Sequence, residues 1–138
     1  MKKIFIPILL AVFILLIIQV YFYIKNTNIN KNITYEIIEE DSYCDIVNKS
    51  FKYNKNTNIV EIYLGEKNTG GYEIKIDNIK YRYNIMTITI SEVSPPSGSM
   101  VTDAFTQPCI KIKPSLKANK VVVIEEDGKK LKSIDSKD

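Results

Sequence analysis

Histidine and tryptophan are absent from the 138 residues, and cysteine occurs only twice. The absence of histidine excludes Ser-His-Asp triads and Cys-His pairs, and it removes the most common general base and metal ligand. Two cysteines are too few for a closed zinc site made of cysteine alone. The sequence therefore excludes the commonest forms of nucleophilic catalysis and of structural zinc binding.

The chain also lacks a strong excess of either charge. Of its 19 basic residues, Lys2 and Lys3 precede a long apolar segment, which leaves 17 basic against 16 acidic residues in the rest. A near-neutral domain has no basic footprint for a phosphate backbone, so we expect no nucleic-acid partner. Acidic clusters at 39–41 and 125–127 lack EF-hand spacing. We predict no catalytic residue, no metal and no cofactor.

An apolar segment long enough to span a bilayer opens the chain. Ile4 to Ile24 contains no charged side chain, and as a helix it would measure about 31 Å against a bilayer core of roughly 30 Å. A cleaved signal peptide, the alternative, would have a shorter apolar core and a small-residue cleavage site. We therefore predict an uncleaved signal anchor in the cell membrane, with a cytoplasmic N-terminus and an extracytoplasmic remainder.

Composition divides the chain into four parts. Residues 1–24 are the predicted transmembrane anchor, the polar residues 25–32 a juxtamembrane tether, residues 33–134 one β-rich domain, and residues 135–138 a charged tail. The abundance of isoleucine, lysine and asparagine is typical of proteins from AT-rich bacterial genomes.

Alternation of apolar and polar residues predicts mainly β-structure in the domain. The expected strands cover residues 33–40, 60–64, 72–76, 86–90, 110–112 and 121–124, with a weak return strand at 131–134 after an Asp127-Gly128 turn. Apolar residues from Tyr43 to Phe51 recur at helical spacing behind Ser42-x-x-Asp45, which predicts a short helix over 42–52. Because several connections are too short for a parallel crossover, we expect an antiparallel sandwich-like or open-barrel domain with one short helix.

The domain is organised around a glycine-rich turn, Gly65-Glu66-Lys67-Asn68-Thr69-Gly70-Gly71-Tyr72. Alternating runs on both sides predict that residues 60–64 and 72–76 pair as a β-hairpin. The adjacent Gly70 and Gly71 indicate backbone at positive φ or very close approach by another chain.

This turn and the residues that follow it resemble the C-terminal domain of the protease-complex subunit PrcB family. The resemblance rests on Gly65-x4-Gly70-Gly71-Tyr72 with Thr69, on Pro95-Pro96, and on Thr106-Gln107-Pro108 before a strand-like stretch at 109–112. It covers roughly residues 59–123. The resemblance implies an extracytoplasmic, non-catalytic protein that associates with a protease and stabilises or restrains it.

A partner-binding surface is the functional hypothesis for the turn. Glycine peptide groups can be approached closely, a threonine hydroxyl is available, and tyrosine offers a broad amphipathic ring. The loop from Pro95 to Gln107 would supply the second half if the sheet brings both to one end. The predicted contact residues are Thr69, Gly70, Gly71, Tyr72, Pro95, Pro96 and Gln107. The alternative is that the glycines only satisfy a turn and that Tyr72 packs beneath it.

Other functions stay open at this level. The Thr-Gly-Gly-Tyr turn is similar to the loop of chagasin-like cysteine-protease inhibitors, and a structural cell-envelope protein would need no protease partner. An enzyme using carboxylates would require two acidic side chains converging in a pocket, which no motif indicates. Cys44 and Cys109 could oxidise to a disulfide in an exported chain if their elements pack together; two free buried cysteines are the alternative.

Overall fold

The computed structural model describes residues 2–27, 33–41 and 43–134 of the chain. The chain separates into two compact units, residues 1–30 and residues 31–138. Most of the predicted tether, Ser42 of the predicted capping box and the predicted tail lie outside the described residues.

The first unit is a single helix, α1 (Lys2–Thr27). Its side chains from Leu9 to Ile24 are mainly apolar and all exposed. Within the part of the chain that the structure describes, no helix meets the length and apolar character that crossing a membrane requires.

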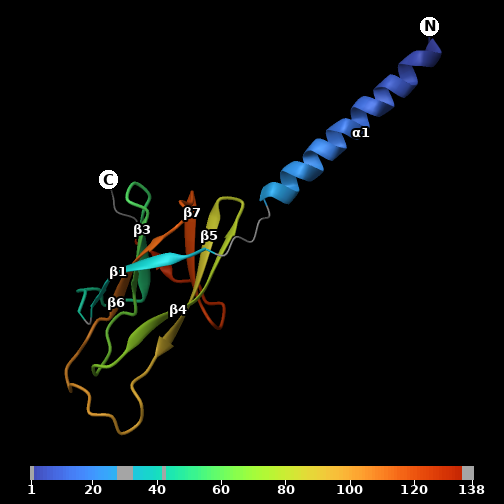
Figure 1. Ribbon diagram of the computed structural model, residues 1–138. Helices are drawn as coiled ribbons and strands as arrows, with labels where there is room; N and C mark the ends of the chain where they lie inside the picture. The colour runs from blue at the N-terminus through green and yellow to red at the C-terminus, as the bar shows by residue number, and fades with distance from the viewer. Residues whose placement is uncertain (1, 28–32, 42, 135–138) are drawn as a thin grey trace. The chain divides into compact units, whose positions relative to one another are not determined.

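The second unit is a β-domain of two sheets (Figure 1). Its described strands are β1 (Tyr35–Asp41), β2 (Ser50–Asn54), β3 (Ile59–Tyr63), β4 (Glu73–Arg82), β5 (Ile85–Val93), β6 (Cys109–Pro114), β7 (Lys120–Glu125) and β8 (Lys132–Ser133). The first sheet has the order β1-β6-β3-β2-β8 and the second has the order β4-β5-β7. The predicted β-rich class is confirmed, and the two sheets do not close into a barrel among the described residues.

The hydrophobic core is made by the inward faces of both sheets. Alternate residues of the central strands are buried, because a strand points successive side chains to opposite faces. Among the most deeply buried side chains are Val60, Ile62, Met86, Ile88, Ile90, Ile110, Ile112 and Val123. The period-two pattern in the sequence therefore identified the core residues of β3, β5 and β6 correctly.

The predicted hairpin between residues 60–64 and 72–76 is wrong. β3 pairs with β2 and β6, whereas β4 is paired with β5, so the two runs belong to different sheets. Alternation of apolar and polar residues indicates that a strand has one buried face, but it does not identify the neighbouring strand. The tight hairpin is β4–β5, in which Tyr83 and Asn84 both have positive φ, as a two-residue turn of this kind requires.

The predicted helix over residues 42–52 is also wrong. Residues 43–49 are irregular, and β2 begins at Ser50. Asp45 has a φ of 54°, which a right-handed helix cannot accommodate. Phe51 is buried in the core from its position in a strand, so its apolar character reflects the sheet and not a helix face.

Two strand pairs are parallel, which corrects the expected antiparallel arrangement. β7 runs parallel beside β5, and β8 runs parallel beside β2. The chain between β5 and β7 includes a long loop and β6 of the other sheet, so this crossover is not a short connection. β7 also alternates: Val121 and Val123 are buried, whereas Val122 and Ile124 are half-buried, so only one of its faces lies in the core.

β1 forms an exposed edge of the first sheet. It pairs antiparallel with β6 from Tyr35 opposite Pro114 to Asp41 opposite Cys109, with a bulge at Ile38. Seven extended residues span about 20 Å. The loops beyond Asp41 and before Cys109 therefore lie at the end of the domain opposite to the one where the chain enters β1.

Candidate functional site

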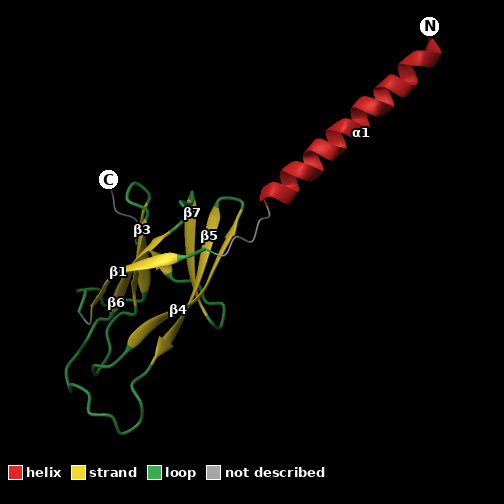
Figure 2. Cartoon of the chain, viewed as in Figure 1, coloured by secondary structure: helices red, strands yellow, loops and turns green. Residues whose placement is uncertain are grey.

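Two loops meet at that far end of the domain. Residues 64–72 lead from β3 in one sheet to β4 in the other, and residues 94–108 form the long loop between β5 and β6 (Figure 2). Lys67 N–H donates to the Thr106 carbonyl at 2.8 Å, and Thr106 N–H donates back to the Lys67 carbonyl at 3.0 Å. The sheet thus brings together the two halves of the predicted surface. We call the combination of these two loops the loop end.

Glycine permits the close contact between the two loops. Gly70 N–H donates to the Thr102 carbonyl at 3.0 Å, and a Cβ added at Gly70 would lie 2.5 Å from Thr102 Oγ1. Gly71 has a φ of 81°, and its added Cβ would lie 3.0 Å from side-chain atoms of Pro95 and Val101. The close approach that the glycine pair predicts is therefore made by the chain's own second loop.

A third segment packs against the same loops. Gly65 has a φ of 74°, and an added Cβ would lie 2.6 Å from the Val47 carbonyl oxygen and 2.9 Å from the Lys49 nitrogen. Glu66 N–H donates to the same Val47 carbonyl at 3.0 Å. The irregular stretch that the sequence assigned to a helix is thus shaped by contact with the glycine-rich loop.

A disulfide joins this third segment to the start of β6. Cys44 and Cys109 are bonded, with their Cα atoms 6.1 Å apart. Cys44 N–H also donates to the Gln107 carbonyl at 3.1 Å. The Gln107 side chain is only 6 % exposed, and its Oε1 atom has no hydrogen-bond partner among the described residues. The bond and the buried glutamine hold the base of the long loop against residues 43–44.

The predicted contact residues differ in how far they reach solvent. Gly71 and Pro96 are exposed, Thr69, Tyr72 and Pro95 are half-buried, and Gly70 and Gln107 are buried. The Thr69 carbonyl accepts a bond from the Thr106 hydroxyl at 2.8 Å. Gly70 and Gln107 therefore hold the loops together, while the others contribute to the surface.

Sequence reasoning missed the most exposed apolar side chains of the loop end. Met100 is fully exposed, Phe105 is 65 % exposed and Val101 is 37 % exposed. All three lie in the Pro-, Gly- and Ser-rich loop, where no alternating pattern gives them a core face. Their exposure could have been predicted from large apolar residues in a stretch without periodicity, because such residues have no strand or helix to bury them.

Four charged side chains form a connected cluster at the base of the loop end. They come from the segment before β2, from the glycine-rich loop, from β5 and from β7: Lys49, Lys67, Glu92 and Glu125. Glu92 accepts from Lys67 at 2.7 Å and from Lys49 at 2.9 Å, and Lys49 also bonds Glu125 at 2.5 Å. Lys67 Nζ lies 5.2 Å from the centre of the Tyr72 ring, a cation–π distance. The cluster connects β5, β7 and the segment before β2 to the glycine-rich loop.

Electrostatics within the cluster favour the charged forms. Burial raises the pKa of Glu92, but the bonds from Lys67 and Lys49 outweigh this effect and leave the pKa below its ordinary value. Burial lowers the pKa of Lys49, but Glu125 and Glu92 reverse the shift and raise it. The ion pairs are therefore retained across the neutral range, which suits a structural support.

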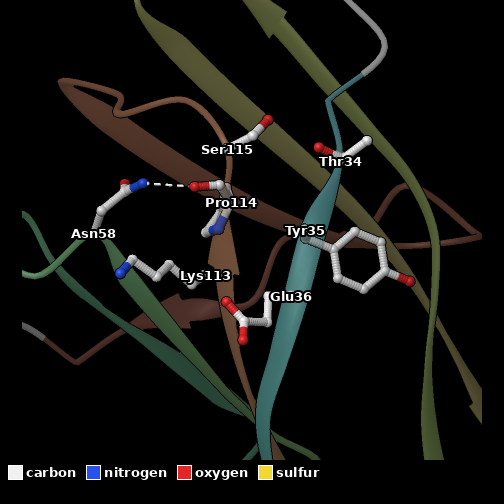
Figure 3. Close-up of a pocket in the computed structure, with 7 residues that line it drawn as sticks. All are labelled: Thr34, Tyr35, Glu36, Asn58, Lys113, Pro114 and Ser115. Carbon is white, nitrogen blue, oxygen red and sulfur yellow. Dashed lines mark hydrogen bonds between the residues drawn. The ribbon is translucent and has the colours of Figure 1, made fainter.

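A separate polar pocket of about 410 Å³ lies at the opposite end of the domain (Figure 3). Its seven lining residues are Thr34, Tyr35, Glu36, Asn58, Lys113, Pro114 and Ser115. Asn58 Nδ2 donates to the Pro114 carbonyl at 2.8 Å, and Tyr53 donates to Asn58 Oδ1 at 3.1 Å. The amide of Asn58 therefore serves to hold the turn after β2 against the end of β6.

The described part of the chain contains no group of three or more histidine, cysteine, aspartate or glutamate residues placed to hold a metal ion. What the loop end offers chemically is a surface of apolar side chains on a firmly bonded backbone, supported by internal ion pairs. Such a surface is suited to contact with another macromolecule.

Residues 59–114 match the family described as PrcB C-terminal. The match begins with β3, includes both loops of the loop end and stops at the last residue of β6. The resemblance seen in the sequence is thereby confirmed over that segment, which is under half of the chain. No curated protein and no solved structure matches the chain.

Proposed function

We propose that this chain, with its PrcB C-terminal segment at residues 59–114, is a membrane-anchored extracytoplasmic protein that binds a protease and stabilises or restrains it. The protease is suggested by the resemblance to the PrcB family of protease-complex subunits. The contact surface is the loop end. We infer a protein partner from the physical features of that surface. We infer that the partner is a protease from the family.

The observation that carries the proposal is the exposure of Met100, Val101 and Phe105 on a loop that is hydrogen-bonded to the glycine-rich loop through Thr102 and Thr106. A long loop without internal strands usually loses conformational entropy when a partner orders it. Here the hydrogen bonds from Gly70 to Thr102 and between the strand-like residues 67 and 106 already restrain the loop. Binding would therefore cost less ordering entropy, and exposed apolar area would be buried.

A protein partner fits this surface better than a small ligand. Small molecules are usually bound in clefts that bury most of their surface. The side chains of Met100 and Phe105 instead extend into solvent, with exposed fractions of 105 % and 65 %. Exposed apolar groups beside polar backbone are typical of protein contact surfaces.

Membrane anchorage is the second part of the proposal. Its support is the uncharged run from Ile4 to Ile24, preceded by Lys2 and Lys3. An extracytoplasmic location also fits the disulfide between Cys44 and Cys109, because disulfides persist in oxidising compartments. The anchor would keep the partner protease at the membrane.

Co-purification tests the proposal. Full-length protein with an affinity tag would be extracted from its native membrane, and captured proteins would be identified by mass spectrometry. We expect a protease with the unaltered chain and its loss with Phe105→Ser or Met100→Ser. Tyr83→Ser is the matched control, since Tyr83 is a 52 % exposed aromatic residue at the β4–β5 turn. Capture of no protease, or equal loss in the control, would contradict the proposal.

A further inference from the structure

The edges of the two sheets lie beside each other on two sides of the domain. On one side, residues 130–134 connect the two edges by hydrogen bonds. Leu131 N–H donates to the Val123 carbonyl of β7 at 2.9 Å, and Ile134 N–H donates to the Phe51 carbonyl of β2 at 2.7 Å. Residues 130–134 thus pair with one edge of each sheet. Leu131 is buried, and the neighbouring Lys130 and Lys132 are exposed.

The other side of the domain is open. Its borders are β1 and β4, which are edge strands of the two sheets: among the described strands β1 pairs only with β6, and β4 only with β5. A groove of about 440 Å³ lies between them and is continued by a hollow of about 230 Å³. Edge strands present unpaired N–H and C=O groups along their outer side.

β1 and β4 run in opposite directions along this groove. The start of β1, at Tyr35, lies with Ile76 to Ile79 of β4, and Glu40 near the end of β1 lies with Glu73 to Ile76. An extended segment placed between them would meet one parallel and one antiparallel neighbour. Both arrangements already occur in this domain.

The groove has a mixed lining, with apolar side chains from both sheets and acidic residues at its borders. The apolar lining comes from both sheets: Tyr35, Ile37, Ile74, Ile76, Val93 and Ile110. Ile37 is 51 % exposed, although it is a large aliphatic side chain in a strand. Glu40, Glu73 and Asp77 are acidic residues along the borders, and the lysine in the lining, Lys75, is 3.4 Å from Asp77.

We propose that the groove between β1 and β4 binds an extended segment of a partner polypeptide that alternates apolar and basic side chains. Strand addition would satisfy the outer backbone groups of the edges, and the apolar side chains would cover Ile37 and Ile76. Basic side chains would face Glu40 and Glu73. The bridged side of the same domain illustrates this arrangement, with a buried leucine between exposed lysines.

Charge decides which occupant the groove favours. β1 contains four acidic residues and no basic residue, Glu36, Glu39, Glu40 and Asp41, of which Glu39 is bonded to Lys111. Pairing β1 with β1 of a second copy would place these carboxylates near one another, which is unfavourable. A basic strand from a different protein avoids that repulsion. This surface is separate from the loop end, and it does not depend on the partner being a protease.

A synthetic peptide tests the groove. The probe is a fluorescent, end-blocked heptapeptide that alternates lysine and valine, titrated into the full-length chain in detergent micelles. We expect saturable binding, with backbone amide shifts in NMR spectra confined to β1, β4 and their neighbours. Glu40→Lys combined with Glu73→Lys should weaken binding about tenfold or more, because both residues lose attraction and gain repulsion.

Controls separate strand addition from simple charge attraction. The same heptapeptide with glutamate in place of lysine should not bind, and a lysine–proline version should bind at least about tenfold more weakly because proline lacks the N–H donor. Glu126→Lys with Asp127→Lys alters an acidic pair that is also exposed, at the turn after β7, and should leave affinity unchanged. The proposal would be overturned if the proline peptide bound as tightly as the valine peptide, or if the control variant lost as much affinity as the Glu40→Lys, Glu73→Lys variant. Absence of amide shifts in β1 and β4 would also overturn it.

Discussion

Backbone conformation at single glycines determines how the segments of the loop end pack together. Gly65 and Gly71 both occupy the left-handed region, and Gly70 is held in contact with Thr102. The positive φ of Gly71 is one of the two features that the glycine pair predicted, and the approach of a partner to the pair stays a prediction. The glycines allow three segments of one chain to pack together, and the exposed side chains that could meet a partner belong to the neighbouring loop.

Replacing Gly65 should be more damaging than replacing an unconstrained glycine. In Gly65→Ala the new Cβ would meet the Val47 carbonyl at 2.6 Å while the backbone has a φ of 74°. Gly128→Ala is the matched control, because its φ is 85° but nothing lies within 4 Å of the new Cβ. We expect a loss of about 2 kcal/mol or more at position 65 and about 1 kcal/mol at position 128. Denaturant unfolding measures both, and equal losses would show that the contact with Val47 is not limiting.

Glu92 gives a prediction that depends on pH. Its pKa is lowered in the folded protein, so its contribution to stability is present above the unfolded value near 4.5 and is lost as pH falls through the folded pKa. Lys49, whose pKa is raised in the folded protein, contributes below its unfolded value near 10.5 and loses its effect as pH rises through the folded pKa. Glu92→Gln should therefore cost about 1–2 kcal/mol at neutral pH and much less in acid.

Thermal unfolding between acid and neutral pH checks this expectation. Glu126→Gln is the control, since Glu126 is exposed near the end of β7. A difference between wild type and Glu92→Gln that stays constant with pH would contradict an ionic role for Glu92. The half-buried Lys67 would also lose its carboxylate partner in this variant, so its cost should exceed that of the control.

At the scale of strands and loops, the sequence predicted the type of element better than its partners. The alternating runs at β3, β4, β5 and β6 correctly indicated strands and their buried faces, because that pattern follows from the geometry of one strand. The pairing of β3 and β4 was wrong because it depends on contacts between distant parts of the chain. The helix assigned to 42–52 failed for a related reason: Phe51 is buried in the core from a strand, whereas Val47 is 59 % exposed, so these apolar residues share no helical face.

The local features of the candidate site were also predictable from the sequence, whereas its long-range contacts were not. Glycine spacing and the proline-rich loop were visible in the sequence, and the two loops do meet. The ionic cluster could not be anticipated, because Lys49 and Glu125 lie on segments that only the two-sheet arrangement brings together. Phe105 likewise becomes notable only once the structure shows that no strand buries it.

The disulfide links two of these elements and gives a test at their scale. Cys44 and Cys109 are separated by 65 residues, so the chain-entropy model assigns their cross-link about 4 kcal/mol. We expect protein isolated without reductant to have the mass of the oxidised form and to lose thermal stability on reduction. Cys44→Ser combined with Cys109→Ser should resemble the reduced protein. Free thiols in the isolated protein, or unchanged stability after reduction, would contradict the cross-link.

For the whole molecule, topology is the next prediction. If residues 4–24 anchor the chain with the N-terminus inside, protease added to intact spheroplasts should remove the β-domain. A tagged cytoplasmic protein serves as the control for membrane integrity and should survive. Digestion of the β-domain only after lysis would place it in the cytoplasm and would contradict the proposed location.

The proposed partner of the loop end is a protease. The most direct measurement places a photo-crosslinking amino acid at position 105 of the full-length chain and, separately, at position 83, followed by irradiation of intact membranes. We expect a covalent adduct from position 105 that mass spectrometry identifies as a protease, and no such adduct from position 83. Absence of a protease adduct at position 105, or equal formation at both positions, would contradict it.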